Sequence, residues 1–340
     1  MQEVRHLKIL MHFGHPAHYH LFKNLIKILE RENHKIKVLS TDKEMLNLLL
    51  SNSKLNYTKI ANESKGFFKI INFFKEILYT LIISRKYKPD VFVGRAQTNL
   101  AIASLFRRKP FVSYSDTDDA FIPRLISIPL SSVVVTPNSY TKSLGVHHKK
   151  FDGYYELCYL HGKYFKRKAA NNIFSKKESV MVRFVSWGAS HDIGKKGITN
   201  LEKLYLLYFL SKHYKVYLSS EIALPKMFYD FCESFDPLDA HQILSKCKLY
   251  VGEGATMASE AACLGVPSVF VSDRELGYIN ELRDNYKLIF QTNSLKAIIK
   301  TIKLHLSKNS NFNKENWFKM LEEKVDVNDY MYKIIINYGK

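Results

Sequence analysis

The residues best suited to chemistry lie in segment 251–267, which reads VGEGATMASEAACLGVP. Its start is typical of a strand that turns through glycines into a helix, where small residues let a ligand approach the backbone. The N–H groups and the dipole of such a helix start favour a phosphate. The expected ligands are the backbone groups of Gly254, Ala255, Thr256 and Met257. Glu260 follows about one turn later, where a carboxylate can bind a ribose diol. A glycine turn beside a solvated glutamate is the alternative.

A second candidate loop follows an expected strand at 180–185. A glycine and small residues after a strand expose N–H groups that can cradle a diphosphate. These residues are Gly188, Ala189 and Ser190. His191 could donate to a phosphate or accept a proton, although a structural histidine is the simpler interpretation. Glu221 follows another expected strand at 215–218 and could reach a hydroxyl of the same ligand or lie at the surface.

The elements that must position these residues alternate between strands and helices. In the first half we expect strands at 7–13, 35–40, 90–94, 110–114 and 132–136, and helices at 20–30, 42–50, 65–86 and 98–106. In the second half we expect strands at 180–185, 215–218, 249–252 and 268–271, and helices at 199–213, 237–247 and 256–264. Two such series predict two doubly wound parallel sheets, whose ligands bind at the carboxyl ends of the strands.

The segment 254–267 also carries a resemblance, through the pattern G-x-T-x-x-x-E-A-x-x-L-G-x-P. This pattern resembles the donor-nucleotide motif of GT-B glycosyltransferases, such as the N-acetylglucosaminyltransferase that completes the lipid-linked peptidoglycan precursor. The segments FGHPAH (13–18), DGYYEL (152–157) and VRFVSWGASHD (182–192) look like the GT-B-like family called domain of unknown function 354. The resemblance implies that Glu260 holds the ribose of a nucleotide sugar, with UDP as the expected nucleotide.

The resemblance also predicts the domain organisation. We expect an α/β, GT-B-like protein with two Rossmann-like domains that face each other across a cleft. The acceptor domain would span 1–165 and the donor domain 166–315. A helical stretch at 316–340 would pack back on the first domain.

In related transferases the loop at 14–20, GHPAHYH, faces the donor, so Gly14 is counted with the donor-binding residues. An inverting transferase needs a general base at the attacking hydroxyl, and histidine suits neutral pH. His18 and then His15 are the candidates. One alternative is that these histidines lie at a helix start, where their ring N–H groups donate hydrogen bonds to backbone carbonyls. A metal site that adds His20 is not favoured, because the spacing is not that of a helical zinc pair.

Acidic residues after the strand at 110–114 offer another base. Asp116 could deprotonate the acceptor or bind sugar hydroxyls, and helix capping by Asp116 or Asp118 is an equal alternative. Arg95, after the strand at 90–94, could meet an anionic acceptor or lie at the surface. GT-B enzymes usually need no metal, so we expect no cofactor beyond the donor substrate.

The chain of 340 residues holds 51 Lys or Arg and 32 Asp or Glu, a formal net charge of +19. This charge predicts an anionic partner. No nucleic-acid-binding pattern accompanies it, so nucleic acid is not expected.

The four cysteines form no C-x-x-C pair, which favours buried reduced thiols over a zinc site. No signal peptide or run of about 20 apolar residues is present, so we expect a cytoplasmic protein.

One helix suggests a membrane surface. In segment 65–88 the stripe of Phe67, Phe68, Ile71, Phe74, Leu78 and Leu81 is explained by core packing. Further apolar residues off this stripe, with lysines and arginines around them, suggest contact with an anionic bilayer on the inner face of the cell membrane. A helix buried between the sheet and a neighbouring element is an equal alternative. Two functions compete with transfer of a sugar to a glycan or lipid-linked acceptor in cell-surface polysaccharide synthesis. They are a nucleotide-sugar 2-epimerase and a non-catalytic nucleotide- or glycan-binding protein.

Overall fold

The computed structural model describes residues 6–62, 68–116, 123–168, 178–186, 197–306 and 314–340. The chain forms two compact units. Unit 1 comprises residues 1–159 together with 325–340, and unit 2 comprises residues 160–324. From the sequence we expected the first domain to end at residue 165 and the chain to return to that domain at residue 316.

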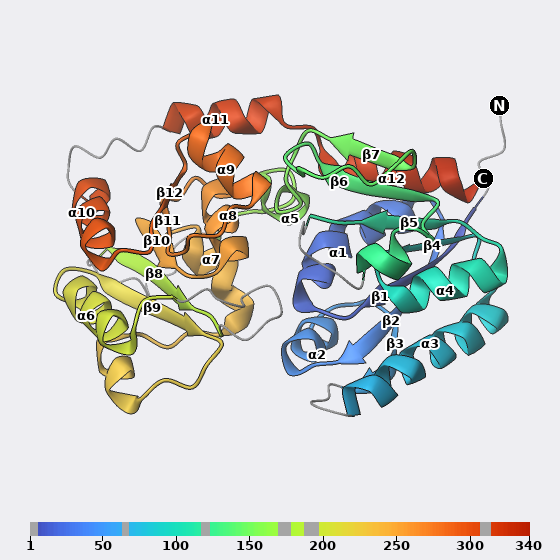
Figure 1. The fold of residues 1–340 in the computed structure, drawn as a ribbon, viewed down its shortest axis with the longest axis horizontal. Coiled ribbons are helices and arrows are strands. Elements are labelled where there is room, and N and C mark those ends of the chain that lie inside the picture. The colour runs from blue at the N-terminus through green and yellow to red at the C-terminus, as the bar shows by residue number, and fades with distance from the viewer. Residues whose placement is uncertain (1–5, 63–67, 117–122, 169–177, 187–196, 307–313) are drawn as a thin grey trace. The chain divides into compact units, whose positions relative to one another are not determined.

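Unit 1 is built on a sheet of seven parallel strands (Figure 1). The strands are β1 (Lys8–Phe13), β2 (Lys35–Asp42), β3 (Tyr57–Asn62), β4 (Val91–Gly94), β5 (Phe111–Tyr114), β6 (Val133–Pro137) and β7 (His148–Phe151). Their order is β3-β2-β1-β4-β5-β6-β7, which begins with the 3-2-1-4-5-6 order of dinucleotide-binding sheets. Strands β4, β5 and β6 are buried along their whole length, as expected for apolar runs in a parallel sheet.

Strands β3 and β7 were not expected from the sequence, and both lie at an edge of the sheet. An edge strand is covered on fewer sides than a central strand, so its sequence need not be an apolar run. Strand β7 reads HKKF and buries only Phe151, while β3 reads YTKIAN and buries only Ile60 and Ala61.

The helices of unit 1 are α1 (Pro16–Arg31), α2 (Glu44–Ser51), α3 (Phe68–Tyr87), α4 (Thr98–Arg107), the short π-helix η1 (Pro123–Ser127) and α12 (Val327–Gly339). Helix α5 (Leu157–Leu160) lies where the two units join in sequence. Helix α12 packs on α1, β4 and β5. Asn328 and Asn24 both donate a side-chain hydrogen bond to the carbonyl of Cys158, at 2.8 and 2.9 Å, and so tie α12 and α1 to one point.

The expected core stripe of α3 is wrong for three of its members. Ile71, Phe74 and Leu78 are exposed, and the small polar residues Thr80 and Ser84 are buried in their place. Leu81 does pack against the core of unit 1. Phe67 and the side chain of Phe68 lie outside the described residues. The inward face of α3 is therefore partly polar, and its outward face is apolar.

Unit 2 is built on five parallel strands, β8 (Ser179–Phe184), β9 (Lys215–Ser220), β10 (Leu249–Gly252), β11 (Ser268–Phe270) and β12 (Ile289–Gln291). Their order is β12-β11-β10-β8-β9, which read from β9 is the 2-1-3-4-5 order of flavodoxin-like sheets. The helical elements are α6 (Asn200–Ser211), η2 (Lys226–Phe231), η3 (Pro237–Asp239), α7 (Ala240–Leu244), α8 (Ala255–Cys263), α9 (Gly277–Asp284), α10 (Leu295–Leu306) and α11 (Lys314–Glu323).

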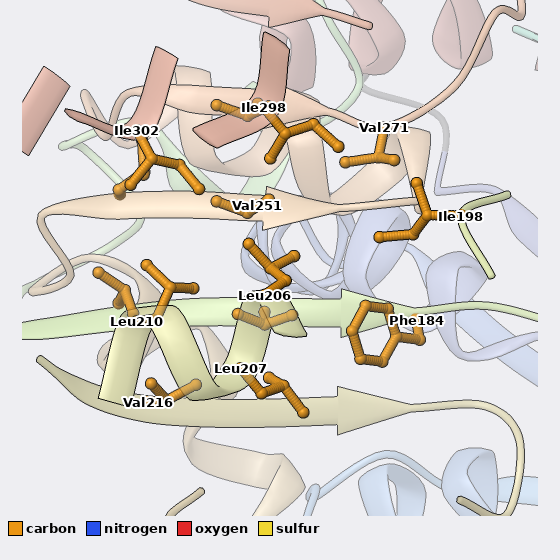
Figure 2. Packing of buried hydrophobic residues seen from close by; sticks show 14 of the residues in the cluster. Phe184, Ile198, Leu206, Leu207, Leu210, Val216, Val251, Val271, Ile298 and Ile302 are labelled. Atoms are coloured by element: carbon orange, nitrogen blue, oxygen red, sulfur yellow. The ribbon is translucent and has the colours of Figure 1, made fainter. Parts of the chain in front are cut away.

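The core of unit 2 lies between the sheet and helices α6 and α10 (Figure 2). Leu206 and Leu210 of α6 and Ile298 and Ile302 of α10 belong to the same buried cluster as Val251 of β10. Helix α6 begins with a capping box in which the Thr199 hydroxyl accepts the N–H of Glu202 and the Glu202 carboxylate accepts the N–H of Thr199. Such a box fixes the start of a helix.

The C-terminal helical stretch is two helices rather than one. Helix α11 belongs to unit 2, where Trp317 packs against Gly265, and α12 belongs to unit 1. The break falls before Asp326, whose carboxylate accepts the N–H groups of Asn328 and Asp329 as the N-cap of α12. Of the cysteines, Cys158, Cys247 and Cys263 are buried, and Cys232 is half-buried.

Candidate functional site

Each sheet has one point where the strand order reverses, and ligands of doubly wound sheets bind there, beyond the carboxyl ends of the strands. In unit 2 this switch point lies between β8 and β10, and in unit 1 it lies between β1 and β4. Segment 253–256 follows β10, the loop at 14–18 follows β1, and Arg95 follows β4. The topology therefore brings most of the residues predicted from the sequence to a switch point.

At the switch point of unit 2, helix α8 begins after a tight glycine turn. A Cβ at Gly252 would lie 2.7 Å from the carbonyl oxygen of Arg183, so only glycine fits between β8 and β10. Gly254 is the N-cap of α8, and no described side chain caps this end. The first intrahelical bond of α8 runs from Ala258 N–H to Gly254 O at 3.0 Å.

The N–H groups of Ala255, Thr256 and Met257 consequently have no acceptor within the helix, as at any helix start. Thr256 is exposed, whereas the Met257 side chain is buried. For Met257, only the backbone N–H group suits the predicted contact with a phosphate.

Arg183 at the end of β8 supplies a positive charge beside this helix start. A Cβ on Gly254 would lie 3.3 Å from Arg183 Nε, which shows how closely the guanidinium approaches the turn. Arg183 Nη1 donates to Ser219 Oγ and Nη2 donates to Glu221 Oε1, each at 2.6 Å. Charge-assisted bonds of this length hold a guanidinium in place. Helix dipole and guanidinium together make the position favourable for an anion.

Glu221 is engaged within the protein. Besides Arg183, its carboxylate accepts the N–H of Ser186 at 3.3 Å, so it orients the arginine and the start of the following loop. Glu221 was expected to reach a hydroxyl of the donor or to lie at the surface. Its described contacts make it a support for Arg183, and the contact with the donor stays a prediction.

A buried ion pair lies behind the same turn. Lys203 Nζ of α6 is 3.2 Å from Glu253 Oε2, and the two side chains are 4% and 0% exposed. Glu253 Oε2 also accepts the N–H of Val185 at 3.1 Å. Lys203 lies over the ring of Phe184 with its nitrogen 4.9 Å from the ring centre. The pair therefore links α6, the end of β8 and the glycine turn.

Glu260 lies in α8, one turn after Thr256, and its side chain is 8% exposed. Glu260 Oε1 is 3.0 Å from Nε2 of His241, which belongs to α7. A histidine in this position fixes the orientation of the carboxylate. The loop predicted to cradle a diphosphate, Gly188, Ala189, Ser190 and His191, lies outside the described residues.

In unit 1 the loop after β1 presents two histidines at the start of α1. His15 is the N-cap, and its Nδ1 accepts the N–H of Ala17 at 3.2 Å. Nδ1 of His18 accepts the N–H of Gly14, also at 3.2 Å. A backbone N–H can only donate, so both Nδ1 atoms are unprotonated and each neutral ring carries its proton on Nε2.

The pKa of His18 is lowered well below its usual value. Burial is the largest cause, and nearby positive charge, first that of Arg95, adds to it. His18 is therefore neutral at physiological pH, and its Nε2–H group is a hydrogen-bond donor.

Asp116 forms an ion pair with Arg95. Burial alone would lower the pKa of Arg95, but the charge of Asp116 raises it above its usual value. The guanidinium also lies 5.3 Å from the ring centre of Tyr155. Asp118 lies outside the described residues. Asp116 was expected as a base or a cap, and its partner in the structure is an arginine.

A directed hydrogen-bond chain supports the switch point of unit 1. The amides of Gln97 and Asn99 approach Nδ1 of buried His12 at 2.9 and 3.1 Å. His12 Nε2 is 3.1 Å from Thr41 Oγ1, which donates to Glu76 Oε1 at 2.6 Å. Burial lowers the pKa of His12, although Glu76 partly opposes this. Gln97 Oε1 accepts the N–H of Arg95 at 3.2 Å, so the chain ends at the ion pair.

Sequence reasoning missed several of these residues as functional candidates. Two left a signal in the sequence. Arg183 interrupts the apolar strand VMVRFV, and Lys203 interrupts the apolar helix NLEKLYLLYFL. A charge inside an apolar run is buried only when it is paired, so each predicts a partner.

Among the described residues no group of three or more His, Cys, Asp or Glu is arranged to hold a metal ion. None of the described helices is long and apolar enough to cross a bilayer.

These observations define the class of protein, an α/β protein of the GT-B fold with one Rossmann-like sheet in each unit. The predicted fold class is confirmed. A family model described as "Protein of unknown function (DUF354)" matches residues 228–340. The match includes the motif at 251–267 that carries the resemblance, and it does not reach the histidine loop at 14–20.

Individual proteins are similar to this chain over most of its length. An uncharacterized protein of Methanocaldococcus jannaschii is 22% identical over 293 residues, which cover 80% of this chain and 81% of that protein. The structure of UDP-N-acetylglucosamine 2-epimerase from Rickettsia bellii matches with a TM-score of 0.72 at 17% identity, over 98% of this chain and 97% of that one. MurG of Acinetobacter baumannii, a glycosyltransferase, matches with a TM-score of 0.58 at 12% identity, over 97% and 99% of the two chains. The GT-B fold thus includes both enzyme classes weighed from the sequence.

Proposed function

We propose that this protein transfers a sugar from a nucleotide-diphosphate sugar, most simply a UDP-sugar, to a glycan or lipid-linked acceptor. One observation carries the proposal. At the switch point of unit 2, the start of α8 has no described side-chain cap and stands beside a braced guanidinium, with a buried carboxylate one turn further on. A nucleoside diphosphate has the matching parts, an anionic diphosphate and a ribose diol.

In this proposal the diphosphate binds to the N–H groups of Ala255, Thr256 and Met257 and to Arg183. No step requires a metal, since the guanidinium and the helix start stabilise the leaving diphosphate. Glu260, oriented by His241, accepts hydrogen bonds from the ribose hydroxyls.

Unit 1 would supply the groups that handle the acceptor. His18 donates from Nε2–H in the tautomer that its contact with Gly14 requires, which suits binding of an oxygen atom. To act as the base, His18 or His15 must release a backbone N–H, or Asp116 must leave Arg95. We therefore infer that the base forms only when substrates bind and one of these contacts breaks.

The ribose contact offers the first test. Isothermal titration calorimetry would compare UDP with 2′,3′-dideoxy-UDP on the wild type and on Glu260→Ala. A hydrogen bond to a charged group contributes about 1.5–3 kcal/mol, so the wild type should prefer UDP by at least tenfold. The variant should bind both ligands equally. If the wild type and Glu260→Ala preferred UDP over 2′,3′-dideoxy-UDP to the same degree, the donor site as proposed would be refuted. The variant His241→Ala should show a preference between those of the wild type and Glu260→Ala.

The 2-epimerase is the second candidate, and one observation favours it, the higher TM-score of 0.72 against 0.58 for MurG. Epimerisation at C2 breaks and remakes the C2–H bond, so it incorporates solvent deuterium, whereas transfer does not. UDP-N-acetylglucosamine incubated with the protein in D2O and followed by NMR separates the two. A deuterated epimer formed without an acceptor would refute transfer. Binding without any turnover, across a panel of acceptors, would favour the non-catalytic binding protein.

A further inference from the structure

Helix α3 turns an apolar face away from the core of unit 1. Phe74, Leu78 and Ile82 are 63%, 56% and 52% exposed, and Ile71 is exposed as well. Positions three or four residues apart lie on the same side of a helix, so these four form one stripe. The buried residues Thr80 and Ser84 mark the opposite side. A soluble helix normally has the reverse arrangement, with its apolar stripe toward the core.

Helix α4 extends this apolar surface. The connections from β3 to β4 and from β4 to β5 step across the sheet in the same direction. Because connections between parallel strands are right-handed, helices α3 and α4 cover the same face of the sheet (Figure 1). The two helices are in contact along the sheet. In the last turn of α4, Leu105 and Phe106 are 58% and 65% exposed. We call the outer surface of these two helices the α3–α4 face.

Nearly all charged residues of the α3–α4 face are basic. Residues 68–88 and 98–109 contain eight Lys or Arg and one acidic residue, Glu76. The Glu76 carboxylate accepts a hydrogen bond from Thr41 of β2, so it is turned toward the sheet. Six of the basic residues lie at or just beyond the C-terminal ends of the two helices, namely Arg85, Lys86, Lys88, Arg107, Arg108 and Lys109. Of these, Lys109 approaches Asp90 at 4.0 Å.

We propose that the α3–α4 face docks on an anionic lipid bilayer. Exposed aromatic and aliphatic side chains on a helix bury in the headgroup region, and clustered lysines and arginines attract acidic lipids. The face carries both features and no outward acid among its described residues, so its charge is complementary to such a surface. This inference goes beyond sugar transfer, because it uses no residue of the donor site and holds whatever reaction that site performs.

Co-sedimentation of the full chain with vesicles tests the proposal, using phosphatidylcholine with and without phosphatidylglycerol. The protein should bind only the anionic vesicles, and added salt should release it. Near an anionic surface each cation strengthens binding roughly fivefold, so Lys86→Glu/Lys88→Glu should weaken it by about 25-fold or more. Lys296→Glu/Lys300→Glu, on exposed positions of α10, makes the same change in net charge and should leave binding within about twofold of wild type.

A second matched pair of variants tests the apolar contribution to vesicle binding. Phe74→Ser/Leu78→Ser should lose vesicle binding, whereas Leu201→Ser/Tyr205→Ser, on the exposed side of α6 in unit 2, should keep it. UDP binding, measured in the same variants, should be unchanged and keeps this test separate from that of the donor site. Equal loss in both members of a pair would overturn the proposal. So would a wild type that ignores anionic vesicles but self-associates through Phe74 and Leu78, since the face would then join copies of the chain.

Discussion

The buried pair of Lys203 and Glu253 makes the strongest stability prediction. Replacing Lys203 with Met keeps the length and the apolar stem but leaves the Glu253 carboxylate, which is 0% exposed, without its counter-charge. Removing one partner of a buried ion pair costs about 3–5 kcal/mol. Glu253 would keep the N–H of Val185, so we expect the lower end, about 3 kcal/mol.

That loss can be converted to a melting temperature. Unit 2 spans residues 160–324, and for a unit of this size 1 kcal/mol shifts the midpoint by about 2–4 °C. The transition of unit 2 should therefore fall by roughly 6–12 °C in Lys203→Met. Differential scanning calorimetry is the assay, because it resolves two transitions where the units unfold separately.

Two variants make the reasoning refutable. Lys300→Met removes an exposed lysine of α10 and should shift the midpoint by less than about 2 °C. The double variant Lys203→Met/Glu253→Gln removes both charges while the glutamine oxygen still accepts the N–H of Val185, so it should recover most of the lost stability. A single variant no worse than Lys300→Met, or a double variant as unstable as Lys203→Met alone, would refute the pair as the cause.

Three further predictions concern the two switch points. Arg183→Gln should weaken UDP binding roughly 10- to 100-fold in calorimetry, as expected for a lost charge-assisted hydrogen bond, and an unchanged Kd would contradict the phosphate role. Gly252→Ala should cost about 1–3 kcal/mol in urea denaturation because its Cβ meets the Arg183 carbonyl, whereas Gly162→Ala, with open space around it, should be neutral. His12 and His18 have lowered pKa values, so below about pH 6.5 the unfolded chain binds more protons and the free energy of unfolding falls. Urea denaturation at several pH values should show a smaller fall in His18→Asn than in the wild type.

The central strands and the donor motif could be predicted from sequence because their signals are local. The strand ending at Gly94 is a short apolar run, and segment 251–267 combines a strand, a glycine turn and a helix in consecutive residues. The edge strands β3 and β7 could not be found in this way, because partial cover allows lysines in them. The outward face of α3 was misassigned, since periodicity shows that a stripe exists but not which side of the helix meets the sheet.

The sequence by itself determined the alternation of strands and helices, and with it two parallel sheets, because hydrophobic runs and glycine turns act over neighbouring residues. It also determined that Glu260 lies one turn into a helix. Only the tertiary structure decided which side chains are already engaged. Asp116 is paired with Arg95, and Glu221 with Arg183, although in each pair the partners are far apart in sequence. Strand order brings them together, and strand order depends on how the chain crosses the sheet, which local patterns do not encode.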